Sequence, residues 1–335
     1  MSVRALVIAL GVILSCAPAA ADERVVLRWA TVAPEGSAWA REGQAFAREV
    51  EQLTEGRVKI KLYWGGITGD ELQTLEQVRR GRIDAIASGG MSCLRMAPSL
   101  RVFRIPGLFR DRGEAAYVNN RLQSTIDAEF LRAGYINLGE LSIGPEMLFT
   151  RDPVRSMSDL ERIKVWFWDL DPVLAALLPA MGLSTISGPI SEALRLFENG
   201  GSQAIVAVPT AALAFQWSAQ SRYLVDLTVG MLRGCLVVTT HAYDALRSED
   251  QHALRVAGAK AALRLEEVGR ESDEALLHGL FVRQGLTLVK PSEAFRSEFL
   301  AAAMAARDQM PDSIVPRALV LKVLTLLADY RGIHQ

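Results

Sequence analysis

The sequence predicts an α/β fold, and two observations carry this prediction. In the first third of the chain, strand-forming and helix-forming segments alternate, which is typical of a largely parallel sheet covered by helices. The chain has 335 residues, of which 50% are hydrophobic and 22% are charged, so two lobes with separate cores can form. The net charge of −1 provides no electrostatic basis for binding nucleic acid or an anionic membrane surface.

Local signals place the elements of this first part. Ser37 is the predicted cap of one helix, and Gly56 and Gly81 follow the predicted helix ends. Apolar and polar residues alternate between residues 58 and 64, as they do in a half-buried strand. The predicted strands are residues 25–30, 58–64 and 83–87, and the predicted helices are residues 38–53 and 71–80.

Ligand-contacting residues are expected where these strands end. Open parallel sheets bind ligands at the carboxyl ends of their strands, and the loops at those ends carry Trp39, Ser88 and Gly89. The backbone of Ser88, Gly89 and Gly90 lacks bulk and could approach a ligand closely. Each loop taken alone could equally be a plain turn.

The N-terminus is predicted to be a signal peptide that covers residues 1–21. Arg4 precedes an apolar run over residues 5–14, which is too short to span a bilayer, and small residues end at Ala21, where cleavage is expected. The alternative is a lipoprotein signal, in which Cys16 becomes a lipidated N-terminus. Both interpretations predict an exported protein.

The second half of the chain continues with strands and helices. Pro172 suits the first turn of a helix, and Ser248 is the predicted cap of a long helix. Residues 280–289 are expected to be extended. The predicted strands are residues 164–168, 223–227 and 234–239, and the predicted helices are residues 171–181, 191–197, 249–279 and the last helices within 292–330.

Residues with catalytic or metal-binding chemistry form no recognisable pattern. The four histidines lack the spacing of metal ligands, and neither a G-x-S-x-G nor a G-x-G-x-x-G motif occurs. The sequence therefore predicts no enzyme, no metal and no cofactor. Cys93 and Cys235 are expected to be buried free thiols, although export would permit a disulfide.

Residues 164–172, KVWFWDLDP, form the most unusual stretch of the chain. Alternation along the strand places Trp166 and Trp168 on one face, and an acidic turn with Asp169 and Asp171 follows. Two indoles beside an acidic turn could be part of a packed core strand or the floor of a binding site.

Several segments resemble the solute-binding proteins of TRAP transporters, which are periplasmic receptors for four-carbon dicarboxylates and other organic acids. The similarity covers residues 27–50, 69–90, 103–111, 152–166, 234–254 and 323–332. It implies a two-lobed periplasmic-binding-protein fold with mostly parallel sheets, hinge strands and a long helix that crosses both lobes. Lobe 1 would comprise residues 22–147 and about 233–272, and lobe 2 residues 148–232 and about 273–335.

The resemblance also implies the biological setting. The receptor would be periplasmic and would deliver its ligand to a small and a large membrane subunit. It departs from the family at the strand where an arginine usually grips the ligand carboxylate, because Trp166 occupies that position. Lys164 lies two residues earlier and does not replace the arginine. A segment that is polar in many relatives is apolar here, over residues 206–208.

These comparisons define the predicted site. Trp29 and Trp64 fall in predicted strands and are expected in the core, whereas the other tryptophans fall at the cleft. The predicted ligand-binding residues are Trp39, Ser88, Gly89, Trp166, Trp168, Asp169, Val208, Pro209, Gln216 and Trp217.

A small hydrophobic or aromatic-stacked ligand is the main expectation, because a buried carboxylate without a paired cation costs several kcal/mol. Relatives that lack the arginine resemble receptors with an extra tetratricopeptide-repeat lipoprotein, which is a further expected partner. One alternative is an ordinary organic-acid receptor in which Arg95, Arg233 or Lys164 supplies the cation. Another is an aromatic cage for a quaternary ammonium near Asp169.

Overall fold

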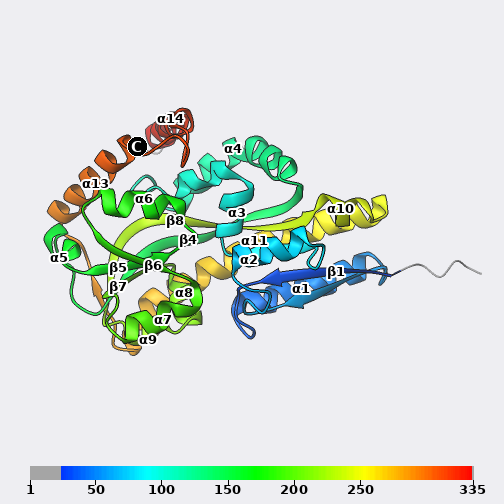
Figure 1. Ribbon diagram of the computed structural model, residues 1–335, viewed down its shortest axis with the longest axis horizontal. Coiled ribbons are helices and arrows are strands. Elements are labelled where there is room, and N and C mark those ends of the chain that lie inside the picture. The colour runs from blue at the N-terminus through cyan, green and yellow to red at the C-terminus, as the bar shows by residue number, and fades with distance from the viewer. Residues whose placement is uncertain (1–23, 334–335) are drawn as a thin grey trace, which may run out of the picture.

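The computed structural model describes residues 24–333, so the predicted signal peptide lies outside the described residues. Within this range the strands form one nine-stranded sheet in the order β2-β1-β3-β8-β4-β7-β5-β6, with β9 beside β8. Helices surround the sheet, and the molecule is elongated along it (Figure 1). No helix of residues 24–333 is both long enough and apolar enough to cross a membrane.

One half of the molecule is built from the N-terminal strands. These strands pair in parallel, as the strand–helix alternation predicts. The helix after β1 begins where Ser37 accepts a hydrogen bond from the Ala40 N–H, which satisfies one free donor of the first turn. The elements are β1 (Val25–Thr31), α1 (Ala38–Leu53), β2 (Val58–Tyr63), α2 (Glu71–Arg79), β3 (Ala85–Ser88), α3 (Met91–Met96), the 3-10 helix η1 (Pro98–Arg104) and α4 (Arg112–Arg132).

The other half contains a second parallel group of strands. Here β5 pairs with both β6 and β7. Asp171 caps the helix after β5 by accepting hydrogen bonds from the N–H groups of Val173 and Leu174. The elements are α5 (Met157–Glu161), β5 (Lys164–Trp168), α6 (Pro172–Ala180), β6 (Ser184–Gly188), α7 (Ile190–Glu198), β7 (Ala204–Ala207), α8 (Pro209–Ala214) and α9 (Trp217–Gln220).

Two long antiparallel strands connect the halves. The strand β4 (Tyr135–Thr150) pairs along its length with β8 (Tyr223–Thr239), and the register shifts at three places. The prediction of separate strands at residues 223–227 and 234–239 is therefore wrong, because β8 is continuous. Pairing with β4 holds residues 230–233, between the two predicted strands, in the sheet, although their own pattern does not indicate a strand.

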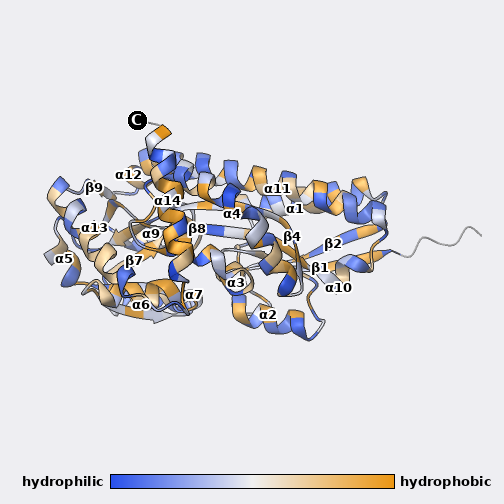
Figure 2. Cartoon of the chain, turned by 90° about the horizontal axis from the view of Figure 1, so that it is seen from above, coloured by the Kyte–Doolittle hydropathy of each residue, from blue (hydrophilic) through white to orange (hydrophobic). Residues whose placement is uncertain are grey.

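A long helix follows β8 and contacts elements of both halves. The helix α11 (Ser248–Ala275) packs on β4, α1 and α8, and Figure 2 shows it running past both halves of the molecule. Ser248 is its first helical residue and not its cap, since the non-helical backbone belongs to Arg247. A short helix, α10 (Thr240–Asp244), precedes it.

The stretch predicted as extended, residues 280–289, is helical at its start and a strand only at its end. After α11, the chain forms a π-helical turn, η2 (Leu276–Leu280), and continues as α12 (Phe281–Arg283). Only β9 (Thr287–Val289) is a strand, and it pairs with β8. Buried packing of Leu276 and Phe281 against the second half explains why the helix continues beyond its predicted end.

The last two helices, α13 (Glu293–Asp308) and α14 (Arg317–Ile333), pack on different parts of the molecule. Helix α13 contacts α5 and α6, whereas α14 lies against α4. The rings of Tyr117 and Tyr330 lie 4.9 Å apart, and Arg331 Nε donates to Glu114 at 2.7 Å. The lobe boundaries implied by the resemblance stay a prediction.

A disulfide joins α3 to β8. The Cα atoms of Cys93 and Cys235 lie 6.0 Å apart, within the range that a disulfide spans, and the two sulfurs are bonded. The expectation of two free thiols is therefore wrong. Sequence spacing carries no information on this pairing, because 142 residues separate the cysteines and the fold alone brings them together.

Replacing both cysteines by alanine is expected to lower the free energy of unfolding by about 2–5 kcal/mol, because the cross-link restricts the unfolded chain. Urea denaturation of the oxidised wild type and the double variant measures this difference. The reduced wild type is the control and should unfold with the variant. Equal midpoints for the oxidised wild type and the variant would contradict the prediction.

Candidate functional site

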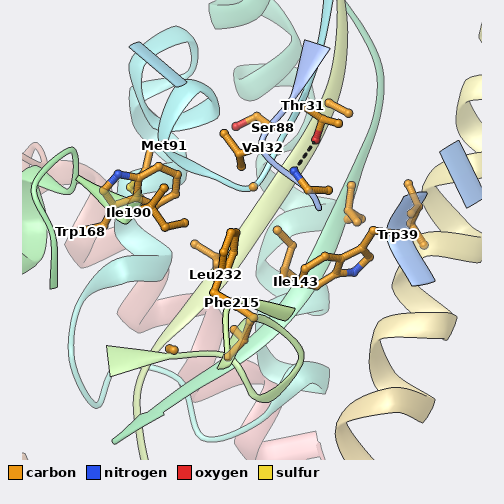
Figure 3. A pocket seen from close by; sticks show the side chains of 18 of the residues that line it. Thr31, Val32, Trp39, Ser88, Met91, Ile143, Trp168, Ile190, Phe215 and Leu232 are labelled. Carbon is orange, nitrogen blue, oxygen red and sulfur yellow. Dashed lines mark hydrogen bonds between the residues drawn. The ribbon is translucent and has the colours of Figure 1, made fainter. Parts of the chain in front are cut away.

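A cavity of about 130 Å³ lies where the two halves meet, bounded by side chains from both parallel groups and from β4 and β8. The first half contributes residues from β1, the loop after it and the loop after β3. The second half contributes residues from β5, β7 and α8. In the close view, Trp168 and Trp39 lie on opposite sides of this space (Figure 3). The carboxyl ends of the parallel strands therefore bound a common cavity, as the fold class predicts.

All six tryptophans of the chain line this cavity. Trp29 is 1% exposed, in agreement with its expected place in the core, but it also forms part of the wall. Trp64 follows β2, is only partly buried and lines the same wall, so the expectation of a core residue is wrong. On the opposite side, Trp217 stacks on Phe215, with the ring centroids 5.1 Å apart.

Seven of the ten predicted ligand-binding residues lie on the cavity wall. Their role in binding stays a prediction, but the fold brings these residues together from distant parts of the chain. They are Trp39, Ser88, Gly89, Trp166, Trp168, Val208 and Trp217.

Asp169, Pro209 and Gln216 do not line the cavity. Asp169 is exposed in the turn after β5, where its N–H donates to the Gly188 carbonyl. Gln216 is exposed between α8 and α9 with a left-handed backbone, at φ 63°. Pro209 is buried as the first residue of α8. The sequence pattern identified the correct loops, but it did not show which side chain of each loop turns inward.

Strand β5 supplies two indoles with different environments. Trp166 is 1% exposed and packs near Trp217, with ring centroids 5.6 Å apart. Its Nε1 is buried and has no hydrogen-bond partner among residues 24–333. Trp168 is partly exposed, and its Nε1 donates to Asp70 Oδ2 at 3.2 Å. This second bond joins β5 to the cap of α2 and so connects the two halves across the cavity.

Glu71 holds the loop after β3 in place. Its buried carboxylate accepts hydrogen bonds from Ser88 Oγ at 2.7 Å and from the N–H groups of Gly89 and Ser92 at 2.6 Å each. Gly90 has a φ of 133°, and a Cβ there would lie 2.7 Å from Leu232. The glycine is thus needed for close packing against β8. This packing accounts for the absence of a side chain at Gly90, and the approach of a ligand is not required to explain it.

The charged group on the cavity wall is an ion cluster centred on Arg104. Its Nε donates to Asp171 Oδ2 at 2.7 Å, its Nη2 lies 2.6 Å from the same oxygen, and its Nη1 donates to Glu146 Oε2. All three side chains are almost completely buried, and Arg104 and Glu146 both line the cavity. Burial opposes the charged form of Arg104, but attraction by Asp171 and Glu146 outweighs this effect and raises its pKa. Burial raises the pKa of Glu146, and the charge of Arg104 only partly offsets it.

The replacement cations considered from the sequence lie elsewhere. Arg95 and Lys164 are exposed, and Arg95 borders a separate surface pocket beside α2. Arg233 is buried near the Phe103 ring, 5.3 Å from its centroid, and does not line the cavity. Sequence reasoning missed Arg104, although it lies in the segment at residues 103–111 that resembles the family. Arg104 is the one cation in the apolar run over residues 102–109, and this was the available signal.

A second buried carboxylate ties the helices behind the cavity. Asp273 on α11 lies in a close ion pair with Arg112 Nη2 of α4 and accepts a hydrogen bond from the Thr210 N–H of α8 at 3.2 Å. Burial raises the pKa of Asp273 to about 6, and the charge of Arg112 opposes this shift. No group of three or more His, Cys, Asp or Glu in the described chain is arranged to hold a metal.

Residues 29–312 match the family model of the bacterial extracellular solute-binding proteins, family 7. A solute-binding protein of Chromohalobacter salexigens is 25% identical over 240 residues, which cover 69% of each chain. The 2,3-diketo-L-gulonate-binding periplasmic protein YiaO of Escherichia coli is 23% identical over 241 residues, covering 69% of this chain and 71% of YiaO.

Solved structures share the fold at low sequence identity. A TRAP periplasmic solute-binding protein of Haemophilus influenzae with bound L-gulonate has a TM-score of 0.83 at 18% identity and covers 91% of this chain and 99% of its own. A second, from Chromohalobacter salexigens with bound D-glucuronate, has a TM-score of 0.80 at 21% identity, with 90% and 99% covered. DctP7 of Bordetella pertussis, which binds pyroglutamic acid, has a TM-score of 0.80 at 16% identity, with 90% and 99% covered.

These findings confirm the predicted two-lobed α/β fold and the predicted kinship with the periplasmic receptors of TRAP transporters. They also agree with the prediction that the chain is a receptor and not an enzyme. The chain belongs to the bacterial extracellular solute-binding proteins of family 7.

Proposed function

We propose that this protein is the extracytoplasmic receptor of a TRAP transporter and that it encloses a small organic acid with an apolar body. The observation that carries this proposal is the largely apolar cavity at the carboxyl ends of the parallel strands, with Arg104 on its wall. The receptor would pass its ligand to the membrane subunits. The signal peptide and the tetratricopeptide-repeat lipoprotein partner stay predictions.

The ligands of the solved relatives favour a ligand with a carboxyl group. The three solved relatives described above hold L-gulonate, D-glucuronate and pyroglutamic acid, each of which has a carboxyl group. These ligands fit the organic-acid alternative better than the purely hydrophobic ligand that the missing arginine suggests. In this protein the cation nearest the ligand would be Arg104, whose terminal nitrogens each carry a second N–H beyond those in its ion pairs.

The composition of the cavity wall favours a ligand whose remaining part is apolar. Tryptophan, phenylalanine and aliphatic side chains form most of it, and among residues 24–333 the only charged side chains on it are Arg104 and Glu146. A sugar acid would bring several hydroxyl groups for which this wall has few partners, and buried hydroxyls without partners are costly. The volume of about 130 Å³ is comparable with a dry engineered cavity of about 150 Å³ that holds benzene in another protein.

A second candidate is an uncharged or cationic aromatic-bound solute. The charge balance favours it, because Arg104 is already paired with both Glu146 and Asp171 and the wall has many indole faces. Asp169, the carboxylate first considered for such a cage, is exposed and does not line the cavity. The carboxylate of such a cage would be Glu146.

A series of probes with one ring and different head groups separates these candidates. We expect benzoate to bind more tightly than benzyl alcohol and benzylammonium, and D-glucuronate to bind weakly. Tryptophan fluorescence gives the affinities, and thermal unfolding gives an independent measure, with about 2.7 kcal/mol of stabilisation at 100 times Kd. If the protein binds benzylammonium more tightly than benzoate, the ligand is a cation and not an organic acid. If it binds D-glucuronate most tightly, the proposal that the ligand has an apolar body is wrong.

A further inference from the structure

The ion cluster on the cavity wall contains an excess of negative charge. Arg104 is the single cation, and Glu146 and Asp171 are two carboxylates that both contact its guanidinium. A ligand carboxylate placed against Arg104 would be the third acid around one buried cation. Like charges in a site of low dielectric destabilise each other strongly, and sharing of a proton is the usual relief for neighbouring carboxyl groups.

The two carboxylates differ in how many hydrogen bonds hold them. Asp171 accepts bonds on both oxygens, from Arg104 on one and from the N–H groups of Val173 and Leu174 on the other. A proton on either oxygen would therefore displace a bond. Glu146 accepts a bond only from Arg104, on Oε2, among the described residues. Its other oxygen is the site in this cluster where a proton can be added without loss of a contact.

The surroundings of Glu146 also favour its neutral form. The charged groups that face it are Arg104, from η1, and Asp171, at the start of α6. Burial raises the pKa of Glu146, Arg104 opposes this, and the charge of Asp171 adds to it. Strand β5 contributes no cation to the cavity. Its two indoles carry neutral Nε1 donors, of which that of Trp166 lacks a partner in the described chain, whereas that of Trp168 donates to Asp70.

We propose that Glu146 takes up one proton when an organic acid binds, so that the ligand carboxylate meets a neutral glutamic acid beside Arg104. This inference rests on the proposed function. The complex then holds one more proton than the free receptor and the free carboxylate. Above the Glu146 pKa of the free receptor, affinity falls by about tenfold per pH unit as pH rises, and below it affinity is level.

Benzoate is the probe, and calorimetric titration of the wild type in phosphate and in Tris counts the protons, because the two buffers differ in ionisation enthalpy. We expect uptake of about one proton per benzoate at the upper end of a series from pH 5.5 to 8.5. Glu146→Gln, which keeps the shape and removes the charge, should bind benzoate without proton uptake and with little pH dependence. Above the Glu146 pKa of the free receptor, the affinity of this variant relative to the wild type should grow by about tenfold per pH unit.

Glu140→Gln is the matched control. Glu140 lies on the same strand, its pKa is also raised by burial, and it does not line the cavity. This variant should keep the proton uptake and the pH slope of the wild type. Benzoate binding by the wild type without proton uptake would overturn the inference even if Glu146→Gln did not fold, and would leave the organic-acid proposal standing. No binding of benzoate at any pH, with binding of benzylammonium, would overturn both.

Discussion

Replacing Arg104 by methionine is expected to lower the free energy of unfolding by about 3–5 kcal/mol at neutral pH. The arginine is 2% exposed, and its removal leaves Glu146 and Asp171 buried beside each other without a cation. Loss of one partner from a buried ion cluster costs more than loss of an exposed pair, because the remaining charges stay desolvated. Urea denaturation of the wild type and the variant measures the difference.

The same variant should respond to pH in a defined direction. Without Arg104, the group with the raised pKa is Glu146, so its protonation relieves the buried charge. In this variant the pKa of Glu146 is higher in the folded state than in the unfolded state. The destabilisation therefore grows as pH rises from the unfolded-state pKa to the folded-state pKa. The loss should therefore be smaller at pH 5 than at pH 7.5.

Arg195→Met provides the control for the Arg104 prediction. Arg195 lies on α7, pairs with Glu192 and is 63% exposed, so its loss should cost no more than about 1 kcal/mol. An Arg104 variant that is as stable as the Arg195 variant would show that the buried cluster contributes nothing to the fold.

Replacing Trp166 by phenylalanine is expected to weaken benzoate binding by about 10- to 100-fold. The buried Nε1 of Trp166 lacks a partner among the described residues, and Trp166 lines the cavity, so we expect this N–H to donate to a ligand oxygen. A hydrogen bond to a charged group contributes about 1.5–3 kcal/mol, which corresponds to this loss. Phenylalanine keeps an aromatic ring in the wall and removes the donor. Fluorescence from the remaining tryptophans can report the affinity.

Toluene is the matched ligand for this variant, because it has the ring of benzoate but no acceptor oxygen. Its affinity should change little between the wild type and Trp166→Phe, and the difference between the two ligands isolates the contribution of the N–H group. An equal loss for both ligands would mean that Trp166 acts only by packing, and an unchanged affinity for benzoate would place the ligand away from β5.

Local sequence signals predicted much of the fold. The Ser37 cap and the bounds of α1 agree with the structure, because a capped amphipathic helix depends on residues close in the chain. The faces of β5 were also predicted, since alternation separates Trp166 from Val165, which lies in a different apolar cluster. The errors fall where distant partners decide, as in the continuous β8 and the helical stretch after α11.

The candidate site shows the same division. Pattern and resemblance identified the loops after β1 and β3 and the strand β5, because strand order and strand ends can be read from the chain. Only the tertiary structure assembled all six tryptophans around one cavity and brought Arg104 to Glu146 and Asp171, across 42 and 67 residues. Periodicity carries no information at such separations, since pairing between distant elements is decided by the packing of the whole sheet. The charge of the cavity, and with it the chemistry of the ligand, therefore depends on contacts that no local pattern contains.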